Sequence, residues 1–136
     1  MTVRTEQMTR LFVYGTLRPS ESRWPAIEEF VARAEPAKLE GFRMHALPEG
    51  YPAIEPGQGE VIGTLLHLEP ALVVAALAKA DQIEGYIEGS PDSLYERVVV
   101  DVGGADAYTY VYHPNRRDHL HTRGRLIESG DWLNRG

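Results

Sequence analysis

The sequence contains no cysteine. Structural disulfides, thiol nucleophiles and zinc–thiolate sites are therefore excluded. This absence is compatible with a cytoplasmic location, which we expect for the protein. A Gly-x-Ser-x-Gly nucleophile elbow is also missing, so the common nucleophilic routes of acyl and amide hydrolases have no support.

Long apolar runs and an excess of positive charge are missing too. No uninterrupted apolar stretch reaches the ~20 residues that a membrane helix needs. The formal net charge of −6 gives no broad attraction to nucleic acid or to an anionic membrane. Acidic residues interrupt or flank the basic run between Arg116 and Arg125, which predicts a solvated surface. We therefore expect neither a nucleic-acid nor a membrane partner. Residues 1–10 are polar and lack an apolar signal-peptide core, so we expect a short lead-in to the first strand.

What is present fits one globular domain spanning residues 1–136. The chain is 43% hydrophobic and 25% charged, and it shows no internal repeat. Residue patterns predict strands at 11–14, 39–47, 60–68, 95–102 and 107–112, with Gly41 as a bulge in the second. They predict helices at 25–33 and 71–83, the latter stopped by Gly85, with residues 72, 73, 76, 77 and 80 on its buried stripe. Residues 103–106 indicate a hairpin loop. The order favours an α+β domain with a curled or closed, mainly antiparallel sheet over a doubly wound parallel sheet.

The first candidate site is the segment Phe12-Val13-Tyr14-Gly15-Thr16-Leu17-Arg18. A strand that ends in Tyr-Gly-Thr-Leu presents successive backbone N–H groups at a turn, and glycine lets a ligand approach the main chain closely. Such a nest suits a carboxylate or a developing oxyanion. Taken alone, the segment is better explained as an ordinary turn.

The second candidate is Glu84, in Asp81-Gln82-Ile83-Glu84-Gly85-Tyr86. A carboxylate at the end of a helix lies at the negative end of the helix dipole, which disfavours its ionisation, and partial burial raises the pKa further. A raised pKa suits a general base that later returns its proton. For an arbitrary glutamate, a solvated position is the commoner outcome. We interpret the neighbouring Asp81 as structural.

Tyrosines and histidines give weaker signals. Tyr108, Tyr110 and Tyr112 alternate along one strand, so they share a face that could either wall a pocket or pack a sheet. His113, His119 and His121 could in principle bind a metal. Because no confident carboxylate joins these histidines, we expect no metal site.

These segments together resemble the γ-glutamylcyclotransferase-like family, which includes γ-glutamylamine cyclotransferases and AIG2-like proteins. The resemblance spans residues 11–132. It rests on the 12–18 and 81–86 segments, on Tyr51-Pro52-Ala53-Ile54, on Val61-Ile62-Gly63-Thr64-Leu65, on Tyr95-Glu96-Arg97 and on the tyrosine-rich strand that ends at Tyr112. Two residues depart from the family pattern. Ala80 replaces a leucine, and Ser20 stands where a glycine often follows the proline of the first motif.

The resemblance implies a β-barrel-like fold with flanking helices and an intramolecular aminolysis that converts a γ-glutamyl compound to 5-oxoproline without a metal or cofactor. Glu84 would be the acid/base, and Tyr14, Gly15, Thr16 and Leu17 would cradle the γ-glutamyl group. Further substrate-binding candidates are Tyr86, Tyr95, Arg97 and Tyr112. Arg97 could pair with a carboxylate, either that of the substrate or that of Glu96 or Asp101.

Two questions stay open at the level of sequence. The same scaffold could be a binding module that holds a small acidic ligand without turning it over. The pattern also names neither the leaving amine nor the oligomeric state.

Overall fold

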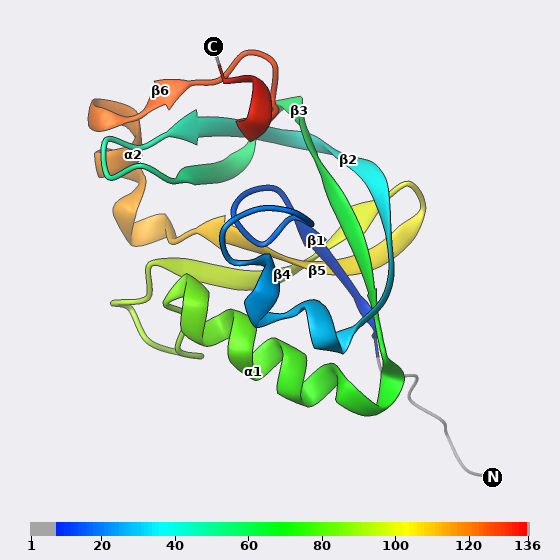
Figure 1. Cartoon of the computed structure of the whole chain (residues 1–136). Coiled ribbons are helices and arrows are strands. Elements are labelled where there is room, and N and C mark those ends of the chain that lie inside the picture. Colours follow the sequence, from blue (N-terminus) through cyan, green and yellow to red (C-terminus); the bar gives the residue numbers. More distant parts are fainter. Residues whose placement is uncertain (1–7, 136) are drawn as a thin grey trace, which may run out of the picture.

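The computed structural model describes residues 8–135, whose strands form one six-stranded sheet flanked by two α-helices (Figure 1). The strands are β1 (Arg10–Val13), β2 (Val31–Ala46), β3 (Pro52–Leu68), β4 (Tyr95–Val102), β5 (Ala105–Tyr112) and β6 (Arg125–Leu126). The helices are α1 (Val73–Glu84) and α2 (Arg117–Arg123). Most of the expected lead-in at residues 1–10 lies outside the described residues. No helix among residues 8–135 is both long and apolar enough to cross a membrane.

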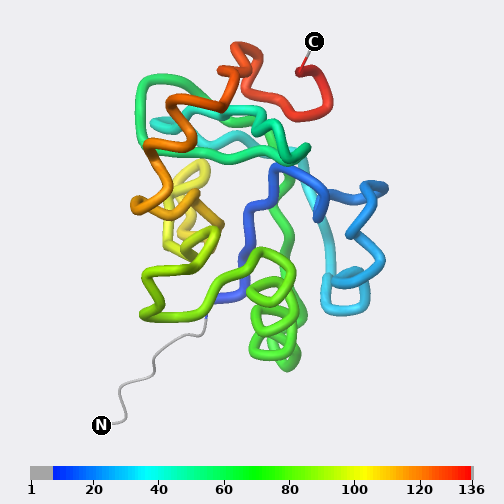
Figure 2. The backbone as a smooth tube through the Cα atoms, turned by 90° about the vertical axis from the view of Figure 1, so that its left-hand side faces the viewer, coloured from blue at the N-terminus to red at the C-terminus, as the bar shows by residue number. Residues whose placement is uncertain are grey.

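The sheet has the order β4-β5-β1-β3-β2-β6 and is mixed. β1 pairs parallel to β5, with Leu11 opposite Tyr108, while all other recorded pairs are antiparallel. The sheet curls into a half-barrel, which confirms the predicted α+β fold class. The short β1 therefore lies at the centre of the sheet, and the segment that follows it leaves from the middle of the molecule (Figure 2).

Side chains alternate between the two faces of the sheet, as the period of two in a strand requires. Leu11 and Val13 belong to a cluster that also contains the apolar stripe of α1. Phe12 and Tyr14 belong to a second cluster on the other face, closed by Met44, Ile127 and Trp132 among others. The predicted alternation in β5 is confirmed, because Tyr108, Tyr110 and Tyr112 face the first cluster and Val111 faces the second.

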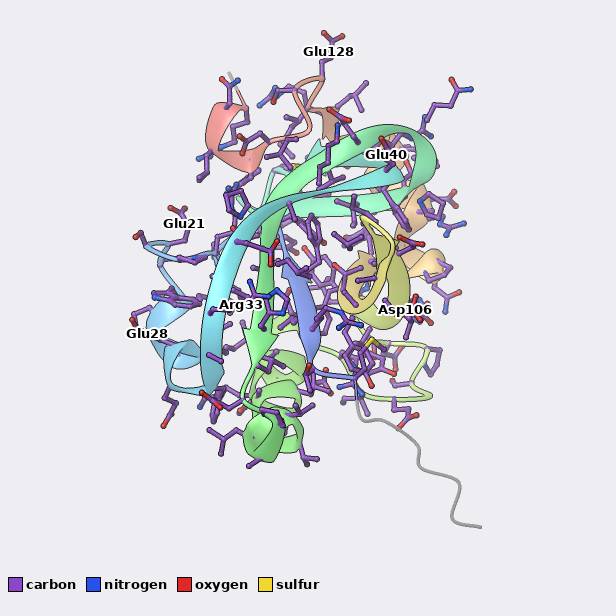
Figure 3. All side chains as sticks on the ribbon, turned by 90° about the vertical axis from the view of Figure 1, so that its right-hand side faces the viewer. Glu21, Glu28, Arg33, Glu40, Asp106 and Glu128 are labelled. Atoms are coloured by element: carbon purple, nitrogen blue, oxygen red, sulfur yellow. The ribbon has the colours of Figure 1, made fainter. Side chains whose placement is uncertain are left out.

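The strands predicted at residues 39–47 and 60–68 are confirmed as β2 and β3, but both are much longer than predicted and they form one hairpin. Its two strands pair from Val31 opposite Leu68 to Ala46 opposite Pro52. The register shifts between Glu40 and Phe42, and Gly41 there has a φ of 83°, so the predicted bulge is confirmed. At this point the two strands curve over, close to the labelled Glu40 in Figure 3. The bend brings the turn at residues 47–51 toward the end of α1.

The helix predicted at residues 71–83 is confirmed as α1, preceded by a single 3-10 turn at Pro70–Leu72. Residues 73, 76, 77 and 80 are buried as expected, whereas Leu72 is exposed. Gly85 ends the helix in the left-handed conformation (φ 66°, ψ 39°), and its N–H donates to the carbonyl oxygens of Asp81 and Gln82. This cap fixes the position of Glu84, the last residue of α1.

The helix predicted at residues 25–33 is wrong. The segment forms two 3-10 turns, Trp24–Ala26 and Glu28–Phe30, and β2 already begins at Val31. The spacing of Ala26, Ile27 and Phe30 suits a helix, but pairing of Val31 with Leu68 draws the chain into the sheet. Glu28 on this segment and Glu21 just before it point outward in Figure 3.

Candidate active site

A cavity of about 280 Å³ opens where β1, α1 and the bent hairpin meet. Its walls come from the end of β1 and the following turn, the segment at 22–23, the turn of the long hairpin, the end of α1 and the strands β4 and β5. The lining residues are Phe12, Val13, Tyr14, Gly15, Thr16, Leu17, Ser22, Arg23, Glu49, Gly50, Tyr51, Pro52, Ile83, Glu84, Leu94, Tyr95 and Tyr110. The two segments that the sequence singles out, residues 14–17 and Glu84, thus line one cavity.

Glu84 is a half-buried acid without a partner. Among residues 8–135 its carboxylate makes no hydrogen bond or ion pair. Burial raises the pKa of Glu84 from 4.5 to about 7, and the charge of Arg23 opposes part of this rise. Such a group can exchange a proton with a ligand in the cavity near neutral pH.

The turn at residues 14–17 presents its N–H groups on the side opposite to its carbonyl oxygens. The carbonyl oxygen of Gly15 accepts from the N–H of Arg18 (3.1 Å), and that of Thr16 accepts from the N–H of Arg23 (2.9 Å). In a trans peptide the N–H points away from the C=O, so the N–H groups of Thr16 and Leu17 face away from these bonds. Within the described part of the chain, the N–H groups of Gly15, Thr16 and Leu17 donate to no other residue. They are available to an oxygen atom of a ligand.

Residue 15 must be glycine because the backbone of the 14–17 turn lies very close to the side chain of Pro52. A Cβ built at this position would lie 2.9 Å from Cγ of Pro52. Pro52 is itself fixed, because its carbonyl oxygen accepts a 2.6 Å hydrogen bond from the Tyr95 hydroxyl. Glycine therefore lets the 14–17 turn pack directly against the turn of the long hairpin.

The turn continues into a tight loop in which Ser20 replaces the glycine expected from the resemblance. Among the described residues, Ser20 is the one non-glycine with positive φ (71°). The backbone conformation that favours glycine is therefore kept although the residue differs.

Three tyrosines that line the cavity use their hydroxyls to hold its walls. The Tyr14 hydroxyl donates to the carbonyl oxygen of Tyr110 (2.6 Å), and the Tyr110 hydroxyl donates to Asp81 Oδ1 (2.7 Å). The Tyr95 hydroxyl donates to Pro52, as described above. Burial, together with the nearby charge of Glu84, raises the pKa of Tyr14 and of Tyr95 well above 10, so both stay protonated. Their hydroxyl hydrogens are committed to the protein, and they shape the site rather than supply protons.

Tyr86, Arg97 and Tyr112 are not among the residues that line the cavity. Arg97 pairs with Asp81 (Nη1–Oδ2 2.6 Å) and lies over the rings of Tyr86 and Tyr108. The predicted ion pair of Arg97 with Glu96 or Asp101 is therefore wrong, because Asp81 occupies the guanidinium instead. Tyr112 is buried and packs edge-on against Tyr95, with 5.5 Å between ring centroids. Substrate contact by these three residues stays a prediction that the geometry does not favour.

We expect Asp81 to act on stability rather than on the chemistry. Replacing Asp81 with Ala leaves the Arg97 guanidinium and the Tyr110 hydroxyl without their partner, which should lower the free energy of unfolding by about 1–3 kcal/mol. Chemical denaturation measures this loss, with Asp92→Ala at an exposed site as control. An Asp81→Ala protein of unchanged stability but abolished turnover would contradict the structural role.

The histidines do not gather into a metal site. His119 pairs with Glu49 (2.8 Å) and His121 with Glu55 (2.8 Å), whereas His113 lies 3.5 Å from Glu96. Across residues 8–135, no group of three or more potential ligands is arranged to hold a metal ion.

Sequence reasoning missed several residues of the cavity, namely Arg23, Glu49, Tyr51 and Pro52. Tyr51 and Pro52 belong to a motif that carries the family resemblance, so that motif was a usable signal. Arg23 has no such signal, because only the loops between residues 18 and 24 bring it back to the turn that precedes it.

Comparisons with known proteins identify the family of the chain. A family model described as "Gamma-glutamyl cyclotransferase, AIG2-like" matches residues 11–134. The chain is 30% identical over 128 residues to the gamma-glutamylcyclotransferase family protein YtfP of Escherichia coli (strain K12), covering 93% of this chain and 97% of that protein. It is 31% identical over 121 residues to the gamma-L-glutamyl-butirosin B gamma-glutamyl cyclotransferase of Niallia circulans, covering 85% and 73% of the two chains. The solution structure of Escherichia coli ytfP superimposes with a TM-score of 0.62 at 26% identity, over 93% of this chain and 97% of that one.

Proposed function

Because the chain belongs to the gamma-glutamyl cyclotransferase, AIG2-like family and is an enzyme of that class, we propose that it converts a γ-glutamyl amine or γ-glutamyl amino acid to 5-oxoproline and the free amine. Glu84 is the acid/base of this reaction, and the N–H groups of residues 15–17 stabilise the charge that develops on the substrate. No metal or organic cofactor takes part. A cytoplasmic setting belongs to the same proposal.

The reaction is an attack of the substrate on itself. Glu84 removes a proton from the α-ammonium group, and the resulting amine attacks the γ-carbonyl carbon. The new C–N bond closes a five-membered ring and leaves a negative oxygen, to which the N–H groups of the 14–17 turn donate. Glu84 then passes this proton to the departing nitrogen as the old C–N bond breaks and the oxyanion returns to a carbonyl group. The ring nitrogen must still lose a second proton to become the lactam N–H, and Glu84, ionised again, takes it and hands it to the freed amine, which leaves as an ammonium ion. Because nucleophile and electrophile share one molecule, the enzyme mainly has to bend the substrate and move its protons.

One observation carries the proposal: an unpaired, desolvated carboxylate lines the same cavity as a turn whose N–H groups have no partner in the described part of the chain. A solvated glutamate would have its ordinary pKa of about 4.3, and would be a poor acid for the leaving nitrogen at pH 7. Because burial raises its pKa to about 7, Glu84 can act as both a base and an acid in the pH range where the substrate amine must lose a proton and the product amine must gain one.

The direct test is a panel of γ-glutamyl compounds incubated with the protein and scored by release of 5-oxoproline. The panel should contain γ-glutamyl amines, γ-glutamyl dipeptides and an isopeptide-linked γ-glutamyl lysine, because the cavity does not identify the leaving group. Release from any member supports the proposal. Binding without release across the whole panel would favour a non-catalytic binding module instead.

The pH dependence of the reaction should follow Glu84. Since the base must be ionised in the free enzyme, kcat/KM should rise with pH and level off above about 7, the pKa of this carboxyl. Below that value the rate should fall about tenfold for each pH unit. Initial rates between pH 5 and 8 measure the profile. A flat profile down to pH 5 would contradict the assignment of Glu84 as the base.

A further inference from the structure

Arg23 is the one positively charged side chain among the described residues that line the cavity. Its N–H donates to the carbonyl oxygen of Thr16 (2.9 Å), so its backbone is tied to the 14–17 turn. Its guanidinium donates to the carbonyl oxygen of Ile83 (3.2 Å), the residue before Glu84. Arg23 therefore bridges the two parts of the site that the proposed reaction uses.

The Arg23 guanidinium has donors to spare. One of its five N–H groups is used on Ile83, and within residues 8–135 it forms no ion pair with a carboxylate, including that of Glu84. Other arginines of the chain behave differently: Arg18, Arg43 and Arg97 are each paired with a carboxylate. An unpaired cation and an unpaired acid thus line one cavity without neutralising each other.

The proposed γ-glutamyl substrate carries the complementary pair of charges on a single carbon. Its α-ammonium group must meet Glu84 for the reaction to start, and its α-carboxylate is then held within a few ångströms of the same point. A carboxylate entering a cavity that already contains Glu84 and Glu49 is repelled unless a cation compensates it. A guanidinium binds a carboxylate through charge-assisted, often bidentate, hydrogen bonds.

Resting on the function proposed above, we propose that Arg23 binds the α-carboxylate of the γ-glutamyl group and makes the enzyme select substrates in which that carboxylate is free. This assignment leaves the N–H groups of residues 15–17 for the γ-carbonyl oxygen. It places the α-amino acid head of the substrate between Arg23 and Glu84, with the departing nitrogen within reach of Glu84 and the rest of the leaving amine directed away from Arg23.

Ligand binding tests Arg23 without relying on turnover. The probes are 5-oxoproline and 2-pyrrolidone, which share a lactam ring and differ only by the carboxylate. The wild type should bind 5-oxoproline more tightly by roughly 10- to 100-fold, the usual range for a charged hydrogen-bonded pair. Arg23→Gln should lose most of this preference, Arg23→Lys should keep part of it, and affinity for 2-pyrrolidone should not change. Arg33→Gln, at an exposed arginine paired with Glu35, is the matched control.

Kinetics give a second readout. With the best substrate of the panel, Arg23→Gln should raise KM by roughly 10- to 100-fold with a smaller change in kcat. The variant should process the α-carboxamide analogue of that substrate as the wild type does. Loss of the cation should also shift the rising limb of the pH profile upward, because Arg23 lowers the pKa of Glu84.

An Arg23→Gln protein that still prefers 5-oxoproline over 2-pyrrolidone as strongly as the wild type would overturn the inference. So would a wild type with no preference between the two probes. Failure of the reaction itself is a separate result, since it appears as the absence of 5-oxoproline release from every member of the panel.

Discussion

Replacing Glu84 with Gln should lower the release of 5-oxoproline by roughly 10²- to 10⁴-fold, the usual contribution of a general acid–base group. The amide has nearly the shape of the carboxyl group but cannot take the proton from the substrate α-ammonium. The cavity, its N–H groups and Arg23 stay in place, so substrate affinity should change little. Turnover number and KM, measured on the best substrate of the panel, separate these two effects.

Two comparisons make the Glu84 result interpretable. Glu88→Gln is the matched control, because Glu88 is exposed and does not line the cavity.

The Glu84→Gln variant should also be folded. Since the folded-state pKa of Glu84 lies above its usual value, ionising this group costs stability as the pH rises toward 7, and Gln lacks that cost. Normal turnover by a folded Glu84→Gln protein would remove the proposed mechanism.

Replacing Gly63 with Ala should lower the free energy of unfolding by about 2–4 kcal/mol. Gly63 lies in β3, behind the end of β1, where an added Cβ would overlap the Val13 carbonyl oxygen and lie 2.7 Å from the Phe12 ring. Backbone atoms cannot swing aside as a flexible side chain does, so β1 and β3 would have to separate. Urea denaturation measures the loss, and residual activity should fall as well because Val13 directly precedes the 14–17 turn.

Gly57→Ala is the matched control for Gly63. Its Cβ would meet the flexible side chain of Arg43 at 3.1 Å, which can move by a few tenths of an ångström. We therefore expect the Gly57 variant to lose much less stability. Equal losses in the two variants would show that the contact with Val13 is not what makes Gly63 necessary.

The elements that the sequence predicts well are those with a local cause. α1 has an apolar stripe, a proline before its start and Gly85 at its end, and the short turn of the β4–β5 hairpin consists of Gly103 and Gly104. The predicted loop of four residues was too long, because Ala105 already pairs with Val102. Where glycine and periodicity act within a few residues, sequence is sufficient.

The long hairpin could not be predicted because its causes are distant in the chain. The first half of β2 is largely exposed and contains Pro36, which usually argues against a strand. Pro36 fits in the strand because β6 pairs only with His45 and Ala46, which leaves the first half of β2 as an edge of the sheet. At an edge, the N–H group that proline lacks needs no partner. In β3 the Pro56–Gly59 segment looks like a turn, yet it is the bend that brings residues 47–52 to the cavity.

The residues of the candidate site also fall into those that the sequence predicts and those that it does not. Glu84 and residues 14–17 carry recognisable motifs, and their presence in one cavity agrees with the interpretation from sequence. Tyr86 and Arg97 belong to motifs that carry the family resemblance, yet neither residue lines the cavity. Their side chains lie beyond Gly85, where the chain has reversed direction, and stack on one another instead.

The central place of β1 constrains how the protein is made. Phe12 and Thr109 are in direct contact through a hydrogen bond although they are 97 residues apart. The Tyr14–Leu17 segment therefore leaves the ribosome early during synthesis. The strand β5, which supports β1 on one side, emerges only after most of the chain has been translated. Loop closure over such distances slows folding. We expect nascent chains that stop before β4 to lack a formed cavity, so that catalytic competence appears late in synthesis.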